Sequence, residues 1–110
     1  MTKGVERVHF ETSAGFLAEA QRLVREMRVH WPAVHQLGHN VSKAESEQVI
    51  FWARTANMRP DIKVPDRWLV WGPGWTKTAV RVVAEVVKAS DGDNVLRILS
   101  AFEEDRTFGS

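Results

Sequence analysis

Three of the four histidines are close enough in the sequence to suggest a metal site. His30, His35 and His39 lie within ten residues, and His35 and His39 have the i, i+4 spacing of a helical ligand pair. Gly38 lies between them, and no acidic residue in this stretch supplies the glutamate of a helical zinc-protease motif. We therefore expect partly exposed histidines near a helix end and no metal site.

A second candidate for chemistry is the glycine-rich segment 72–78, which ends in Lys77-Thr78 as phosphate-binding loops do. A Walker-type loop has glycine immediately before its lysine, but Thr76 occupies that position and Pro73 removes a backbone donor. The segment therefore predicts a turn and a helix cap. A helix N-terminus beside Lys77 that holds an anion is the weaker alternative.

The remaining sequence contains no local catalytic signature. The absence of cysteine excludes disulfides, thiolate nucleophiles and cysteine-ligated metal sites. Residues 91–94 are too short for a calcium loop. We expect no catalytic residue and no cofactor; an enzyme ranks third, and a pocket that joins a histidine to a carboxylate and a hydroxyl would favour it.

Residue types suited to binding are concentrated in the middle of the chain. Residues 54–81 carry six basic and two acidic side chains, a net charge of +4, and include three of the five tryptophans. Aromatic rings among cations suit single-stranded nucleic acid, and tryptophan and arginine are also enriched at protein-protein hot spots. The candidate binding residues are Trp71, Trp75, Arg54, Arg59, Lys63, Arg67, Lys77 and Arg81.

The elements that position these residues follow from the apolar spacing. We expect a strand over residues 5–10, a helix from the cap Ser13 to Trp31, and a helix over 43–57 that begins with a Ser42/Glu45 capping box. Residues 62–64 and 67–71 are predicted to be extended. Trp68 and Trp71 then lie on opposite faces of one strand, and at least one belongs to the core.

Residues 79–89 are ambiguous because their five valines favour a strand whereas their spacing also fits a helix. We assign a helix because Arg81, Glu85 and Lys88 then share one narrow stripe. The rest of that helix would be apolar and would need a partner. Residues 91–94 form a turn, and 95–102 a last helix.

The predicted fold is a mostly helical α+β domain, with about four helices and a two- or three-stranded sheet, over residues 1–110. The tail 105–110 is expected to fray. No apolar run reaches the ~20 residues that span a bilayer, so we expect no membrane contact and a cytoplasmic location.

The leading hypothesis for function is a small non-enzymatic protein-interaction or regulatory module that binds through an apolar surface of tryptophans and valines. Self-association into a homodimer is one form of this hypothesis. The alternative is a nucleic-acid-binding module that uses the basic, tryptophan-rich segment 54–81.

Overall fold

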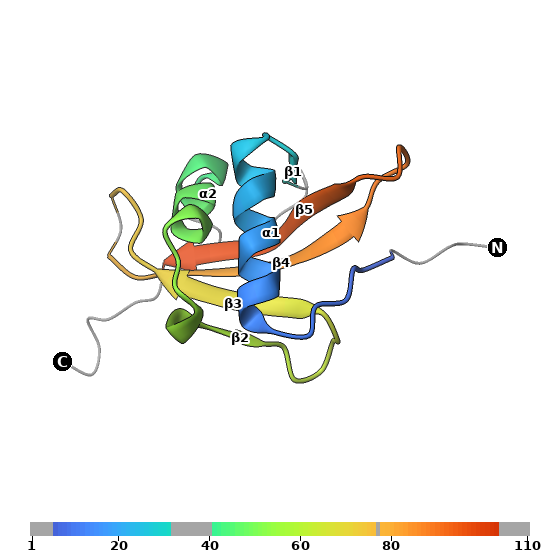
Figure 1. Cartoon of the computed structure of the whole chain (residues 1–110). Coiled ribbons are helices and arrows are strands. Elements are labelled where there is room, and N and C mark those ends of the chain that lie inside the picture. The colour runs from blue at the N-terminus through green and yellow to red at the C-terminus, as the bar shows by residue number, and fades with distance from the viewer. Residues whose placement is uncertain (1–5, 32–40, 77, 104–110) are drawn as a thin grey trace.

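Two α-helices pack on one face of a five-stranded mixed sheet in the computed structural model, which describes residues 6–31, 41–76 and 78–103 (Figure 1). The helices are α1 (Ser13–Arg25) and α2 (Lys43–Phe51), with a short 3-10 helix η1 (Thr55–Asn57). The strands are β1 (Val29–His30), β2 (Met58–Pro60), β3 (Arg67–Gly72), β4 (Val80–Lys88) and β5 (Asn94–Glu103). Their order is β1-β5-β4-β3-β2, with β1 parallel to β5 and the other pairs antiparallel.

The prediction of a mostly helical fold is therefore wrong. Residues 79–89 and 95–102 are both predicted to be helical, but the first segment contains β4 and the second lies within β5, the two longest strands. The predicted turn at 91–94 is present up to Asp93, where it closes a β-hairpin with Gly92 at φ +88°, and Asn94 begins β5. The sheet thus has more strands than predicted, and the described residues contain fewer helices.

The charged residues account for the wrong prediction of a helix at β4. Arg81 and Glu85 share one face in a strand as well, because their positions differ by four, an even number. Only Lys88 lies on the other face, and it ends the strand, where it is exposed. The β-branched valines decide the outcome, since alternate residues from Val80 to Val86 are fully buried against the helices.

Helix α1 begins and ends earlier than predicted. Its N-cap is Thr12, whose Oγ1 accepts from the Gly15 amide at 3.0 Å. The helix ends at Arg25, and Met27 at φ 59° leads the chain into β1. Of the apolar stripe that the helical spacing predicts, Phe16, Ala20 and Leu23 are buried, whereas Met27 lies beyond the end of the helix and is 81% exposed.

Helix α2 has the predicted N-terminus and a shorter body. The Ser42 Oγ accepts from the Glu45 amide at 3.1 Å, which is the serine half of the predicted capping box. The helix ends at Phe51, where the Gln21 side chain of α1 donates to the carbonyls of Ile50 and Phe51 at 3.3 and 3.0 Å. Helix α1 thus satisfies carbonyl groups at the end of α2 and fixes the two helices together.

The core lies between the helices and the sheet. The Phe16 ring of α1 stacks on Trp68 of β3 with centroids 5.1 Å apart, and Phe10 meets Phe16 edge to face at 5.7 Å. The prediction that Trp68 or Trp71 belongs to the core is confirmed by Trp68, which is 5% exposed.

The remaining predicted extended segments are confirmed only in part. Residues 62–64 form a turn, and the strand of this region is β2, which begins at Met58. Arg7 forms an isolated bridge to Val87 of β4, so part of the predicted strand 5–10 does lie beside the sheet. In the described part of the chain, no helix is long and apolar enough to cross a membrane. The tail 105–110 lies outside the described residues.

Candidate functional site

The candidate site is the sheet face opposite the helices, which we call the outer face. Figure 1 shows both α-helices on the other side of the sheet. The strand pairing places the following side chains on the outer face, because they alternate with the buried positions: Arg59, Arg67, Leu69, Trp71, Arg81, Val83, Glu85, Val87, Val95, Arg97, Ser100 and Phe102.

These side chains form successive rows across the strands. Arg67, Glu85 and Arg97 pair in one row. Leu69, Val83 and Ser100 form the next, and Trp71, Arg81 and Phe102 the one after it. Val87 and Val95 pair in a further row beyond Glu85 and Arg97. Between that row and the other end of the strands, the outer face has a charged region, which we call the charged end, an apolar middle and an aromatic end, each about 7 Å from the next.

The charged end is a cluster of three guanidinium groups around one carboxylate. Glu85 is only 1% exposed. Its Oε1 accepts from Arg7 Nε at 3.0 Å and from Arg67 Nε at 3.2 Å. Arg97 Nη1 lies 3.8 Å from its Oε2, and the Arg7–Val87 bridge brings Arg7 into the group. We call Arg7, Arg67, Arg97 and Glu85 the arginine cluster.

The arginine cluster has a surplus of positive charge and of hydrogen-bond donors. Three guanidinium groups against one carboxylate leave a net charge of +2. Arg97 Nε is buried and has no hydrogen-bond partner among the described residues. Arginine also presents five donors in a fixed fork, whereas one carboxylate accepts about four hydrogen bonds. The cluster is therefore suited to an additional anion, and a phosphate group has the matching geometry.

Next to the arginine cluster lies an apolar hollow of about 300 Å³. Its floor includes Leu69 and Val83, the row adjacent to Arg67 and Glu85. Ile62, which is 87% exposed, also lines it, together with Arg59, Lys63 and Asp61. A flat apolar group that entered this hollow would lie beside two cations and one carboxylate.

The aromatic end of the outer face holds Trp71 and Phe102 on either side of Arg81. Phe102 is 36% exposed and Trp71 is half-buried. Trp71 also lines a second hollow of about 350 Å³ with Trp52 and Arg54, at the edge of the sheet beside α2.

A histidine and a carboxylate flank the charged end. His9 Nδ1 lies 2.9 Å from Asp66 Oδ1, which also accepts from the Phe10 amide at 3.2 Å. The hydrogen bond with Asp66, together with its charge and a smaller effect of Glu11, raises the pKa of His9 above its usual value. His9 is therefore more protonated at neutral pH than a free histidine.

The structure brings four predicted binding residues together on the outer face, namely Arg59, Arg67, Trp71 and Arg81. Lys63 lines the adjacent hollow. Arg54 lies beside the second hollow, and Trp75 is 64% exposed on the loop between β3 and β4. Lys77 lies outside the described residues.

Sequence reasoning missed Arg7, Glu85, Arg97, Phe102 and His9 as site residues. The sequence pattern places Glu85 and Phe102 on helices, so it does not predict their neighbours on the adjacent strands. The signal that would have placed Glu85 was the alternation of valines in β4. Arg7 and Arg97 reach the site only through pairing with β4, which local sequence does not encode.

The glycine-rich segment that resembled a phosphate loop is the hairpin loop between β3 and β4. The buried Glu45 carboxylate accepts from the Thr76 amide at 2.7 Å and from Thr76 Oγ1 at 3.0 Å. The alternative of an anion at a helix N-terminus is wrong, because strand β4 follows this loop.

The sequence offers three histidines as candidate metal ligands but predicts no metal site. His30 is exposed on β1, whereas His35 and His39 lie outside the described residues. Within the described residues no three potential ligands of the His, Cys, Asp or Glu type are grouped together.

Comparisons with protein-family models, curated proteins and solved structures found no match to this chain.

Proposed function

We propose that the protein binds single-stranded nucleic acid on the outer face of its sheet. The observation that carries the proposal is the arginine cluster, where three guanidinium groups share one buried carboxylate. Its surplus charge and donors suit a phosphodiester group, and arginine binds phosphate with two parallel hydrogen bonds.

The wider charge of the outer face favours the same ligand. The outer face of the sheet carries four arginines and one glutamate: Arg59, Arg67, Arg81, Arg97 and Glu85. The bordering segment adds Arg7, next to Glu6. Several cations along one surface can contact successive phosphates of one strand. A nucleic acid chain is therefore a better match than an isolated anion.

Sites for bases lie next to the sites for phosphates. The hollow beside Leu69 and Val83 is apolar and open, and Ile62 projects beside it. Trp71 and Phe102 offer rings at the far end of the face. Unpaired bases can enter a hollow or stack on rings, whereas a duplex keeps its bases inside, so we expect a preference for single strands.

The test is fluorescence anisotropy with a labelled oligonucleotide of about 12 nucleotides. We expect binding of single-stranded RNA or DNA that weakens steeply with salt, and weaker binding of a duplex of the same sequence. Quenching of tryptophan fluorescence should accompany binding, because Trp71 lies on the outer face. Absence of binding at low ionic strength would refute the proposal.

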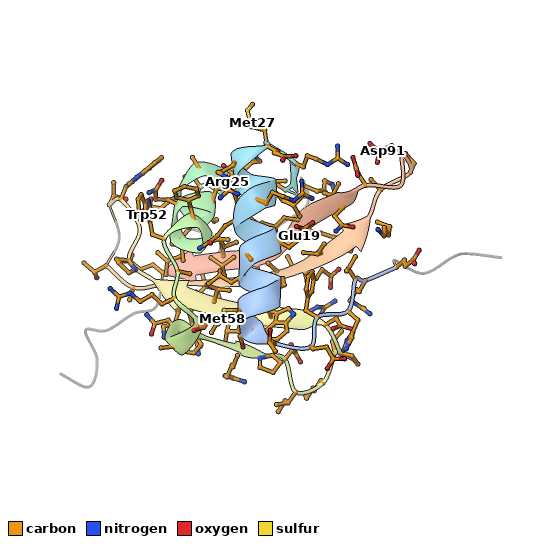
Figure 2. All side chains as sticks on the ribbon, in the orientation of Figure 1. Glu19, Arg25, Met27, Trp52, Met58 and Asp91 are labelled. Atoms are coloured by element: carbon orange, nitrogen blue, oxygen red, sulfur yellow. The ribbon has the colours of Figure 1, made fainter. Side chains whose placement is uncertain are left out.

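Protein binding, the leading hypothesis from the sequence, is the second candidate here and rests on a different observation. The apolar valine helix that first suggested a partner is strand β4, which is buried against α1 and α2 on one face. Two other large side chains are exposed, Trp52 at 68% and Trp75 at 64%. Figure 2 shows Trp52 on the side of the molecule from which the β3–β4 loop projects.

Exposed tryptophans are typical of contact hot spots. Self-association through Trp52 and Trp75 predicts a dimer in light scattering, and Trp52→Ala would return it to a monomer. A monomer at every concentration would reject the homodimer. The regulatory role and the cytoplasmic location stay predictions from the sequence.

A further inference from the structure

The segment that brings Arg7 to the arginine cluster also carries His9. Arg7 pairs with Val87 in an antiparallel bridge, and the Val8 amide donates to the Val86 carbonyl at 2.8 Å. The pairing ends there, because Arg67 of β3 lies opposite Glu85 on the same edge of β4. Val8 and Phe10 pack against the core, so the alternating residues Arg7 and His9 project to the other side. His9 also contacts Asp66, the residue before Arg67, and therefore lies at the border of the cluster.

Asp66 fixes the position of His9 at this border. Its Oδ1 lies 2.9 Å from His9 Nδ1 and accepts from the Phe10 amide at 3.2 Å. Asp66 also directly precedes Arg67, which contacts Glu85. A carboxylate at Nδ1 orients an imidazole and leaves Nε2 to exchange protons, as in acid-base enzymes. Nε2 lies 3.6 Å from Glu11, whose side chain is 89% exposed and can move aside.

We propose that this corner of the outer face cleaves RNA, with His9 Nε2 as the general base beside a phosphodiester held by Arg7 and Arg67. The inference rests on the proposed nucleic-acid binding and deepens it by naming RNA and a reaction. The attacking group is the ribose 2′-hydroxyl next to the bound phosphate. A site with anion donors, a histidine and an oriented carboxylate has the groups for this step.

The reaction is an intramolecular transesterification. The 2′-oxygen forms a bond to phosphorus while its proton passes to His9 Nε2. The bond between phosphorus and the 5′-oxygen breaks, and that oxygen takes a proton from water. The products are a 2′,3′-cyclic phosphate and a free 5′-hydroxyl, and His9 then releases its proton to solvent. No oxidation or reduction takes place.

Arg7 and Arg67 stabilise the charge that develops on the phosphoryl oxygens. Each uses Nε for Glu85 in the structure, and the terminal nitrogens of both side chains have no hydrogen-bond partner among the described residues. Glu85 and Asp66 do not touch the substrate in this arrangement. They are positioning residues, Glu85 for the guanidinium groups and Asp66 for the imidazole.

The experiment compares the full chain with His9→Gln and with the matched control His30→Gln. His9 and His30 are both exposed, so neither substitution removes a core contact. The substrates are a labelled single-stranded RNA and the same strand with 2′-O-methyl groups throughout. Each reaction contains a chelator to suppress metal-dependent contaminants, and the three proteins are purified in the same way.

We expect the wild-type protein and His30→Gln to cut the RNA and to leave 2′,3′-cyclic phosphate ends. His9→Gln should cut at least ~100-fold more slowly while it binds the uncut strand equally well. The 2′-O-methyl strand should be bound and left intact. Equal cleavage by His9→Gln, or cutting of the 2′-O-methyl strand, would overturn the proposal.

Binding without cleavage would also overturn this inference, although the proposed function would stand. Absence of binding would refute both. Asp66→Asn tests the positioning role through the pH profile of cleavage. The titratable groups that contact His9 are Asp66 and Glu11. Arg67 follows Asp66 in the chain, and Arg7 lies two residues before His9. Loss of the Asp66 charge should move the rising limb of the profile to lower pH, and an unmoved limb would reject that role.

Discussion

At the residue scale, one glutamate organises the outer face. Glu85 is buried on β4, and guanidinium groups from three other segments gather at its carboxylate. A buried carboxylate needs partners of opposite charge, so the arginines satisfy it. The three arginines are each about 30% exposed at the side chain, and this leaves them accessible to a ligand.

Glu85→Gln should separate the role of the arginines in stability from their role in binding a ligand. Loss of the buried charge leaves three guanidinium groups without their counter-ion, and we expect unfolding to become easier by about 1–3 kcal/mol. The same change raises the net charge of the arginine cluster, so affinity for a single strand at low salt should increase. Urea denaturation and anisotropy measure the two effects. Unchanged stability would contradict this account of the cluster.

Asp66→Asn tests the electrostatic environment of His9. Asn keeps the shape and tolerates the left-handed backbone at this position, where φ is 64°. Since Asp66 raises the pKa of His9, the substitution should lower that pKa toward about 6.5, as measured by NMR titration of the ring protons. An unchanged titration would show that Asp66 has no such effect.

The raised pKa of His9 also determines how the stability cost of Asp66→Asn changes with pH. His9 has a higher pKa in the folded state than in the unfolded state, where it is about 6.5. Its interaction with Asp66 therefore contributes its full stabilisation below about pH 6.5, and this contribution is lost as the pH rises through the folded-state pKa. The difference in stability between the wild-type protein and Asp66→Asn should therefore be larger at mildly acidic pH than at alkaline pH. Denaturation at two pH values checks this direction.

At the element scale, the N-terminus of α2 holds the hairpin loop between β3 and β4. Glu45 lies in the first turn of α2, and its carboxylate accepts from the backbone and side chain of Thr76. Gly74 packs directly against this carboxylate, where a Cβ would lie 2.6 Å from Glu45 Cγ. The loop therefore depends on a glycine for close approach and not for a positive φ.

Gly74→Ala should consequently destabilise the protein by about 1–3 kcal/mol, because the added methyl group displaces a buried side chain. Gly92→Ala is the matched control: no atom lies within 4 Å of its added Cβ, and φ +88° leaves only a backbone cost of about 1–2 kcal/mol. In the Glu45→Ala background the Gly74→Ala cost should shrink, as urea denaturation of the double mutant would measure. Fully additive costs would contradict the contact.

At the scale of helices and strands, the sequence predicts only part of the fold. The cap of α2 and the inner face of α1 could be predicted, since Ser42 caps α2 and Phe16, Ala20 and Leu23 are buried. The cap of α1 is Thr12 and not the predicted Ser13. Strands β4 and β5 could not be predicted, because an apolar segment with charges at i, i+4 fits both a helix and a strand. Pairing with β3 and β5 decides this for β4, and pairing is a property of the whole sheet.

At the scale of the whole molecule, the sheet sorts the side chains by face. The helices cover one face of the sheet with the core between them (Figure 1). The charged end, the hollow and the aromatic end occupy the outer face. The sequence predicted Arg59, Arg67 and Arg81 as binding residues from composition, and the sheet does bring them to one face. Arg7 and Arg97 come from distant parts of the chain, so the segment 54–81 alone could not identify the site.

The salt dependence of binding tests the central claim most directly, with Arg59→Gln and Arg97→Gln on the outer face and Arg25→Gln as control. Arg25 is exposed on α1, in the helical layer (Figure 2). All three variants lose one positive charge. Each outer-face substitution should reduce the slope of log affinity against log salt by about 0.7 for a single strand. Arg25→Gln should leave the slope unchanged, and equal slopes for all three variants would contradict binding at the outer face.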